Sequence, residues 1–314
     1  MFMANLQPSH RGFGRTAAPD TDKTRPMAIE WRIYHDKVLA EWYSLLSGEP
    51  EEEEVQHFLE LHPSMIPGGS GDVGPGGHHG SDVGGVFRRP RLGGEGRTFE
   101  PDFMWVTRSS SLITPILIEI EKPAKRWFRK DGRPTSQFTE AHDQLNDWRA
   151  WFAREGNKSI FRQTFLLLKE KWEDRPLDPQ FLLIYGRESE FQFGGGHENP
   201  RALRYKRDQQ RGESESFMTF DSLRPRFDHS DSMTLTMTAL GPKIHAFSPV
   251  FGTGPQIGEA ACLLGDPSEA LGRSVMMSSA RREYLAKRWS YWQQYEQGKG
   301  MDQNGLRAYR PGIE

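Results

Sequence analysis

Three acidic residues flank two neighbouring apolar segments between residues 98 and 123. Asp102 precedes the run FMWV, and Glu119 and Glu121 end the run ITPILIEIE. The polar residues RSSS between the runs predict a β-hairpin, with Glu119 and Glu121 on one face of its second strand and Asp102 across from them. Acids at the ends of an arbitrary hairpin are more often simply solvated. Three carboxylates converging at one edge instead require a cation or raised pKa values, which favours a site.

Oxygen ligands of this kind suit a hard divalent cation. Two carboxylates and one backbone carbonyl at the junction of two strands would hold Mg²⁺ or Mn²⁺. We expect Asp102 and Glu119 to bind the ion, with the carbonyl of Ile120 as third ligand, Glu121 facing the attacking water and Lys122 beside it. Such an ion lowers the pKa of a bound water and neutralises charge on a phosphate, which is the chemistry of phosphodiester hydrolysis.

The composition restricts the class of protein. The 314 residues are 35% hydrophobic, with a mean hydropathy of -0.73, so we expect an ordinary core with polar insertions and tails. The net charge of -2 gives no global sign of a nucleic-acid partner, and basic surface must be local. Cys262 is the single cysteine of the sequence, which rules out an internal disulfide. Since no apolar run reaches membrane-spanning length, we expect a cytoplasmic protein without membrane contact.

The elements that must position the acids follow from periodicity. Helical spacing predicts helices over residues 27–48, 50–63, 139–155, 201–211 and 280–297, and apolar runs predict strands over 103–106, 113–121, 161–169 and 179–189. A short strand and turn follow within 216–227. This order predicts an α/β fold with a small mixed β-sheet flanked by helices.

The remaining segments suggest how the chain is divided. We expect a disordered arm over residues 1–26, a main domain over 27–245 with a Gly-rich insertion at 67–97, a linker over 246–275 and a helical tail over 276–314. His78 and His79 lie within the Gly-rich stretch, but no spaced histidine or cysteine completes a metal ligand set there.

The acids and their neighbours resemble a known nuclease core. Pro101-Asp102 followed after sixteen residues by Glu119-Ile120-Glu121-Lys122-Pro123 looks like the PD-(D/E)XK superfamily, and more closely the Shedu family of bacterial anti-phage nucleases. EEEEVQHFLELHP resembles that family's first helix, with Glu52 as the matching acid, and AHDQLNDW resembles the helix after the catalytic strand, with Gln144 as the matched residue. FLLIYGRESEF and FMTFDSL match later strands. The resemblance covers about residues 50 to 225 and implies a restriction-endonuclease-like core.

One position departs from the superfamily pattern. Its usual residue is lysine where this chain has Glu121. A carboxylate cannot stabilise negative charge as a cation does, but it can act as a general base or bind a second metal ion. Lys122 leaves the opposite face of a regular strand, so it replaces the missing lysine only if the strand bulges.

Cations for a DNA backbone follow the acidic strand directly. The segment KRWFRKDGR supplies the expected DNA-binding residues Lys125, Arg126, Arg129, Lys130 and Arg133. A second basic run, RALRYKRDQQR, extends from residue 201, with a solvated helix face as the other interpretation. Trp127 and Phe128 would either stack on a frayed base or, more often in such cases, pack into the core.

The sequence thus predicts a Mg²⁺- or Mn²⁺-dependent DNA endonuclease, and the resemblance implies a role in anti-phage defence. One alternative is a nuclease fold with a degraded site that binds nucleic acid or a partner without cutting, because Glu121 replaces the usual lysine. Another is an interaction protein whose aromatic C-terminal helix mediates assembly. That helix carries an apolar stripe that would dock on its own domain or on a second subunit, and the resemblance favours a homo-oligomer.

Overall fold

The computed structural model describes residues 25–74, 80–168, 174–254 and 257–298. Its helices are α1 (Trp31–Ser47), α2 (Glu52–Leu61), α3 (Ser136–Phe152), α4 (Glu155–Phe165), α5 (Pro200–Gln209), α6 (Gly258–Leu264), α7 (Ser268–Arg273) and α8 (Ser279–Glu296). Its strands are β1 (Ser81–Arg88), β2 (Phe103–Arg108), β3 (Ile113–Ile120), β4 (Gln180–Ile184), β5 (Glu215–Met218), β6 (Met233–Thr238) and β7 (Gly241–Phe247). Most of the predicted arm, the His78-His79 pair and the end of the tail lie outside the described residues.

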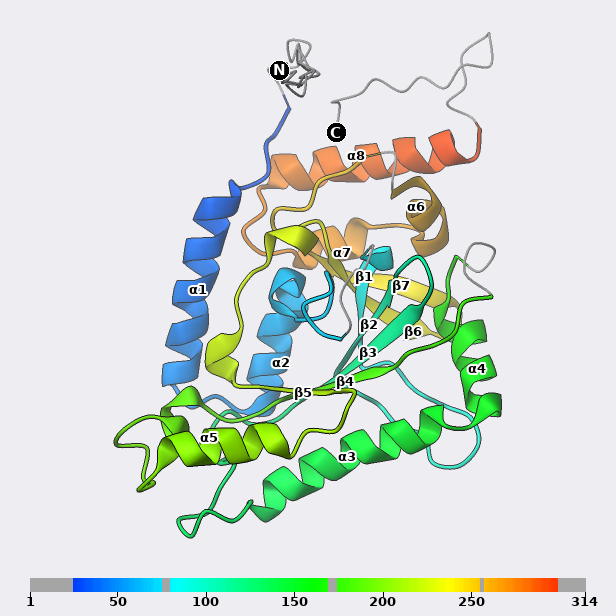
Figure 1. Cartoon of the computed structure of the whole chain (residues 1–314). Coiled ribbons are helices and arrows are strands. Elements are labelled where there is room, and N and C mark those ends of the chain that lie inside the picture. Colours follow the sequence, from blue (N-terminus) through cyan, green and yellow to red (C-terminus); the bar gives the residue numbers. More distant parts are fainter. Residues whose placement is uncertain (1–24, 75–79, 169–173, 255–256, 299–314) are drawn as a thin grey trace, which may run out of the picture.

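The strands form one mixed seven-stranded sheet in the order β5-β4-β3-β2-β1-β6-β7. The β2–β3 and β1–β2 pairs are antiparallel, whereas β4 is parallel to both β3 and β5. Helices α1 and α2 pack on one face and α3 and α4 on the other, as the two buried clusters of apolar side chains show (Figure 1). The predicted α/β class with a mixed sheet flanked by helices is confirmed.

The alternation of side chains along β3 decides which residues reach each face. Ile116, Ile118 and Ile120 pack in the cluster beneath α1 and α2, while Leu117 packs in the cluster beneath α3. Glu119 therefore points toward the α3 face, near the carboxyl end of the strand. The hairpin predicted for β2 and β3 is confirmed.

Three predicted segments differ from the structure. The stretch FRQTFLLLK was expected as a strand, but its first five residues end α4. A short apolar run fits a buried helix as well as a buried strand. The Gly-rich insertion contains β1, an internal strand. Glycine is needed at position 85, since a Cβ there would lie 2.5 Å from Leu235 on neighbouring β6. Helix α3 begins after Thr135, whose hydroxyl accepts a hydrogen bond from Phe138 N, and not at Thr139.

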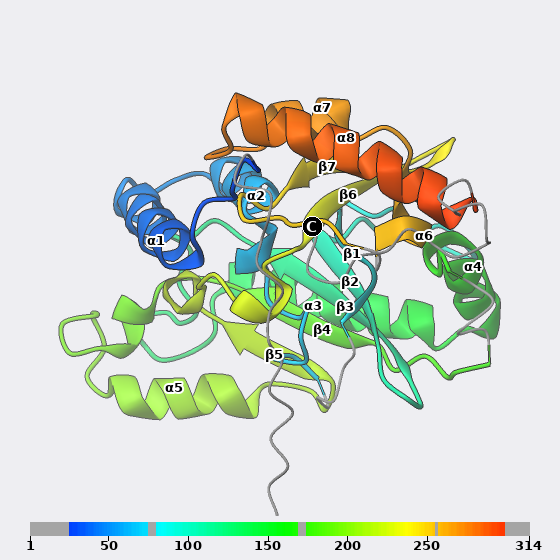
Figure 2. The same ribbon diagram turned by 90° about the horizontal axis from the view of Figure 1, so that it is seen from above.

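The segment expected as a linker, residues 246–275, holds α6 and α7 and contributes buried side chains to the main core. Gly265 and Pro267 lie between these two short helices. Helix α8 lies across the β7 side of the molecule, with α5 on the opposite side beside β5 (Figure 2).

The aromatic stripe of α8 packs on its own chain. Trp289 and Trp292 are each 1% exposed, and the indole nitrogen of Trp289 donates to Gly265 O at 2.8 Å. Of the two roles expected for this helix, the described residues show the intramolecular brace. The homo-oligomer stays a prediction. None of the described helices combines the length and apolar character needed to cross a membrane.

Candidate active site

The open end of the β2–β3 hairpin brings two of the predicted acids together. Phe103 pairs with Ile118, which places Asp102 across from Glu119. The Oδ2 atom of Asp102 accepts a hydrogen bond from Ile120 N at 2.8 Å, and its backbone carbonyl accepts one from Arg89 N at 2.7 Å. Asp102 is thus fixed from two strands, as the spacing predicts.

Both carboxyl groups are held in an environment that disfavours their charge. Burial raises the pKa of Asp102 to about 7, and the charges of Glu52 and Glu121 add to this effect while the Ile120 N–H opposes it. Burial, followed by the charge of Asp102, raises the pKa of Glu119 well above its usual range. Four carboxyl groups therefore influence one another at this hairpin end.

One oxygen of Glu119 lacks a hydrogen-bond partner. Its Oε2 atom is buried and unpaired, while the side-chain amide of Gln144 on α3 stabilises the charged form of the same carboxylate. A buried carboxylate oxygen without a partner is costly, and such atoms are rare in folded proteins. Gln144 thus reaches the site from the helix edge, as predicted from its position.

Helix α2 carries Glu52 to the site from the other face of the sheet. The helix starts with a capping box in which Glu51 N donates to Glu54 Oε2 at 2.9 Å, and Glu52 is its first residue. Burial and the charge of Glu121 raise the pKa of Glu52. One turn later, Gln56 has a buried side-chain nitrogen without a partner. The sequence placed Gln56 on the same helix face but did not select it as a site residue.

The two lysines after β3 have different partners. Lys122 pairs with Glu51 at the start of α2. Lys125 pairs with Glu121, whose backbone N–H donates to Ile184 O of β4 at 3.2 Å. The structure gives Lys122 no contact with the hairpin acids, whereas Lys125, predicted only to bind DNA, brings a positive charge to Glu121. No sequence pattern identified that pairing, because it crosses a turn after the strand.

The residues at the hairpin end meet some, but not all, of the requirements of a site for a divalent cation. An ion near Glu119 Oε2 would satisfy the unpaired oxygen and neutralise the repulsion that raises the two pKa values. Within the part of the chain that the structure describes, no three histidine, cysteine, aspartate or glutamate side chains are grouped as ligands of one ion. Two carboxylates with the Ile120 carbonyl form the smaller predicted set, and Glu121 as a third side-chain ligand stays a prediction.

The basic segment after the site divides into exposed cations and buried aromatic residues. Arg126, Arg129, Lys130 and Arg133 are exposed. Trp127 and Phe128 are 0% and 1% exposed, so of the two roles predicted for them the structure shows packing in the core. Their backbone N–H groups both donate to the buried carboxylate of Glu190, each at 2.9 Å. Glu190 therefore fixes the basic segment beside the site, a role that no sequence signal suggested.

The second basic run forms α5, and none of its residues is buried. Several of its cations already have partners: Arg204 pairs with Glu188, Arg207 pairs with Asp208 at 2.8 Å, and Lys206 donates to Gly132 O at 2.7 Å. The first basic segment also has a paired cation, since Arg129 lies 2.8 Å from Asp131, but it directly follows the hairpin acids and is therefore the better candidate for contact with phosphates.

Comparison with known proteins gives one match. A family model described as Shedu protein SduA, C-terminal, matches residues 49–224, more than half of the 314 residues. The matched range contains Glu52, the hairpin acids Asp102, Glu119 and Glu121, and Gln144. Neither the search of curated proteins nor that of solved structures found a match. On the family match, the chain belongs to the Shedu SduA C-terminal family.

Proposed function

We propose that this protein is a metal-dependent DNA endonuclease of a bacterial anti-phage defence system, with a PD-(D/E)XK-type core. The observation that carries the proposal is the pair of buried carboxyl groups at the hairpin end, one of which has an unpaired oxygen. A structural acid in the same position would be expected to have acquired a partner. The family membership supports the defence role.

Asp102 and Glu119, with the Ile120 carbonyl, would hold Mg²⁺ or Mn²⁺. Such an ion, when bound, lowers the pKa of water and neutralises charge on a phosphate. Gln144 orients the Glu119 carboxylate through its amide, and Glu52 adds negative charge that strengthens attraction for a cation.

The ion pair between Glu121 and Lys125 supplies the remaining groups. Glu121 is suited to accept the proton of the attacking water, since it follows Glu119 at the end of the hairpin and its carboxylate is oriented by the ion pair with Lys125. Lys125 brings to the site the positive charge that the superfamily usually supplies from the position of Glu121. Arg126, Arg129, Lys130 and Arg133 would contact the DNA backbone without reading its sequence.

Supercoiled plasmid tests this proposal. Incubation with Mg²⁺ should give nicked or linear DNA, and EDTA should prevent it. Asp102→Ala should be inactive, while Asp143→Ala, which removes an exposed acid from α3, should cut like the wild type. A plasmid that migrates more slowly on a gel but is not cut would favour the alternative, a module that binds nucleic acid. The supporting observation for that alternative is the ion pair that occupies Glu121.

A further inference from the structure

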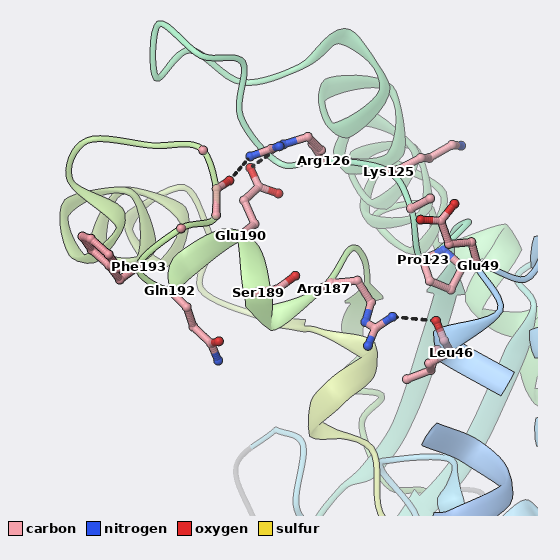
Figure 3. Close-up of a pocket in the computed structure, with 14 residues that line it drawn as sticks. Leu46, Glu49, Pro123, Lys125, Arg126, Arg187, Ser189, Glu190, Gln192 and Phe193 are labelled. Carbon is pink, nitrogen blue, oxygen red and sulfur yellow. Dashed lines mark hydrogen bonds and ion pairs between the residues drawn. The ribbon is translucent and has the colours of Figure 1, made fainter. Parts of the chain in front are cut away.

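A pocket of about 600 Å³ lies beside the turn that follows β3. Its wall comes from the end of α1, the turn after β3, and the segment from Arg187 to Gly196 (Figure 3). Lys125 lines this pocket and pairs with Glu121, so one side chain connects the pocket to the proposed reaction centre. A molecule in the pocket that contacts Lys125 would therefore be one side chain away from Glu121.

Three cations and two carboxylates line the pocket, and they are not equally available. Arg187 is fixed by Asp221, at 2.9 Å, and by Leu46 O, at 2.8 Å. The Glu190 carboxylate accepts hydrogen bonds from the Trp127 and Phe128 N–H groups, and these use much of its capacity to accept further hydrogen bonds. The other carboxylate is Glu49, an exposed residue near the end of α1.

Arg126 is the cation best placed to bind a ligand. Its Nη2 atom donates to Gly195 O at 2.5 Å (Figure 3). The same atom lies 3.1 Å from the ring nitrogen of His197. Its nearest paired carboxylate oxygen, from Glu190, is 3.9 Å away, and half of the side chain is exposed. Arg126 is thus held in place while several of its N–H donors stay open to a phosphate.

A glycine turn forms the outer rim of the pocket. A Cβ at Gly195 would lie 2.4 Å from Ser189 O, and Gly194 and Gly196 have φ values of 89° and 87°. The turn packs so closely on the preceding residues that only glycine fits. It leaves the Phe193 ring fully exposed, on the outer side of the turn from Arg187 (Figure 3). An exposed aromatic ring near phosphate-binding cations is a platform on which a nucleobase can stack.

The size of the pocket limits what can enter it. A volume of about 600 Å³ is typical of sites for small ligands and is sufficient for one nucleotide. We propose that the pocket and the Phe193 rim receive one unpaired nucleotide next to the phosphate to be cut. The substrate class is then duplex DNA that is locally open at the cleavage position. This inference rests on the proposed nuclease function for its location beside the reacting phosphate.

Binding in EDTA tests this inference independently of cleavage. Two duplexes of equal length are compared with the full chain, one fully paired and one with a single bulged 2-aminopurine. The wild type should bind the bulged duplex about tenfold more tightly, given the typical strength of stacking on an aromatic side chain, and should quench the fluorescence of the bulged base.

Variants identify the group responsible. Phe193→Ala should lose the preference and the quenching, and Phe193→Trp should keep both. Leu240→Ala is the matched control, since Leu240 is equally exposed but lies in the β6–β7 turn. Equal affinity of the wild type for the two duplexes, or an unchanged preference in Phe193→Ala, would overturn the inference. Cutting of both duplexes in Mg²⁺ with equal binding rejects only the pocket, whereas a bulge preference without cutting rejects only the nuclease.

Discussion

Two glutamates, Glu215 and Glu119, contact helix α3, and their pKa values are shifted in opposite directions. Glu215 begins β5 and accepts hydrogen bonds from Arg149 and His142 of α3 and from Gly212 N. Although burial alone would raise its pKa, these partners lower it to about 2. Glu119 ends β3, receives only the neutral amide of Gln144 from α3, and keeps one oxygen unpaired, so its pKa lies well above the usual range.

The difference separates a structural carboxylate from a candidate catalytic one. The chain supplies Arg149 and His142 as partners for Glu215, so α3 carries side chains that can stabilise a buried acid. At Glu119 no cation among the described residues pairs with the acid, and three further acids, Asp102, Glu121 and Glu52, add to the effect of burial in raising its pKa. Acids that raise one another's pKa destabilise the metal-free protein. This is consistent with a site that binds a cation from solution.

The strongest test of the comparison is removal of a hairpin acid. Asp102→Ala or Glu119→Ala should lower cleavage by at least about a thousandfold, because the proposed cation loses a ligand. The thermal midpoint of the metal-free protein should not fall, since each change also relieves repulsion. Plasmid cleavage and thermal unfolding in EDTA measure the two effects, and full activity of purified Asp102→Ala protein would refute the assignment of the site.

Removal of Glu215 should have the opposite outcome. Glu215→Ala leaves Arg149 and His142 without their partner and should lower the free energy of unfolding by about 3 kcal/mol. Cleavage by the folded fraction should stay close to that of the wild type. Denaturant unfolding and plasmid cleavage below the unfolding transition measure this, and a loss of activity without a loss of stability would show that Glu215 belongs to the site.

Residues that support the hairpin acids should have intermediate effects. Gln144→Ala or Glu52→Ala should lower the cleavage rate about 10- to 100-fold, as expected when an orienting group is removed. The affinity for the metal ion should fall in parallel, so that more metal is needed for cleavage. Asp143→Ala serves as the control, since it changes the exposed neighbour of Gln144 on α3. Wild-type rate and metal dependence in both variants would mean that α2 and α3 do not support the site.

The contributions of Asp102 and Glu215 to the stability of the fold should change with pH in opposite directions. Asp102 is protonated more readily in the folded chain than in the unfolded one, so its contribution is present at low pH and is lost as pH rises from about 4 to about 7. Glu215 has a lowered pKa, so its contribution is present above about pH 4 and is lost on acidification toward pH 2. Thermal unfolding in EDTA should show Asp102→Asn gaining stability over the wild type near pH 8 but not near pH 4. A gain of equal size at both values would contradict the assigned shift.

The smallest effect on cleavage is expected from a change that loosens the basic segment after β3. Glu190→Gln keeps the size of the side chain and one acceptor, but weakens its bonds to Trp127 N and Phe128 N. Cleavage should fall only severalfold, through a higher KM for DNA, because the loop loses rigidity while the hairpin acids are unchanged. A fall in kcat alone would place Glu190 in the chemistry instead.

The sequence predicted the hairpin and its acids well, because alternation along ITPILIEIE and the acids at its end are local signals. Gln144 and Glu52, selected from helical spacing and the family resemblance, lie close to the hairpin acids in the structure, and their role in catalysis stays a prediction. Strand β1 was missed because glycine hides the alternation of Val83, Val86 and Phe87. Strands β6 and β7 were missed although MTLTMT is rich in β-branched residues.

The contacts that determine the electrostatics could not be predicted from local patterns. Lys125 reaches Glu121 across a turn, and Glu190 reaches Trp127 N from 63 residues away. Such pairs depend on how β3 and β4 end side by side. Likewise, only the packing shows that Phe128 is buried while Phe193 is exposed.

Binding of Mn²⁺ to the purified full chain, measured by calorimetry and by electron paramagnetic resonance, tests the central claim most directly. The wild type should bind Mn²⁺ at the hairpin end, with protons released on binding because the carboxyl groups must ionise. Glu119→Gln should lose this binding, and Glu215→Gln, the matched change at the satisfied carboxylate, should retain it. Equal Mn²⁺ binding by wild type and Glu119→Gln, or none by the wild type, would contradict the account.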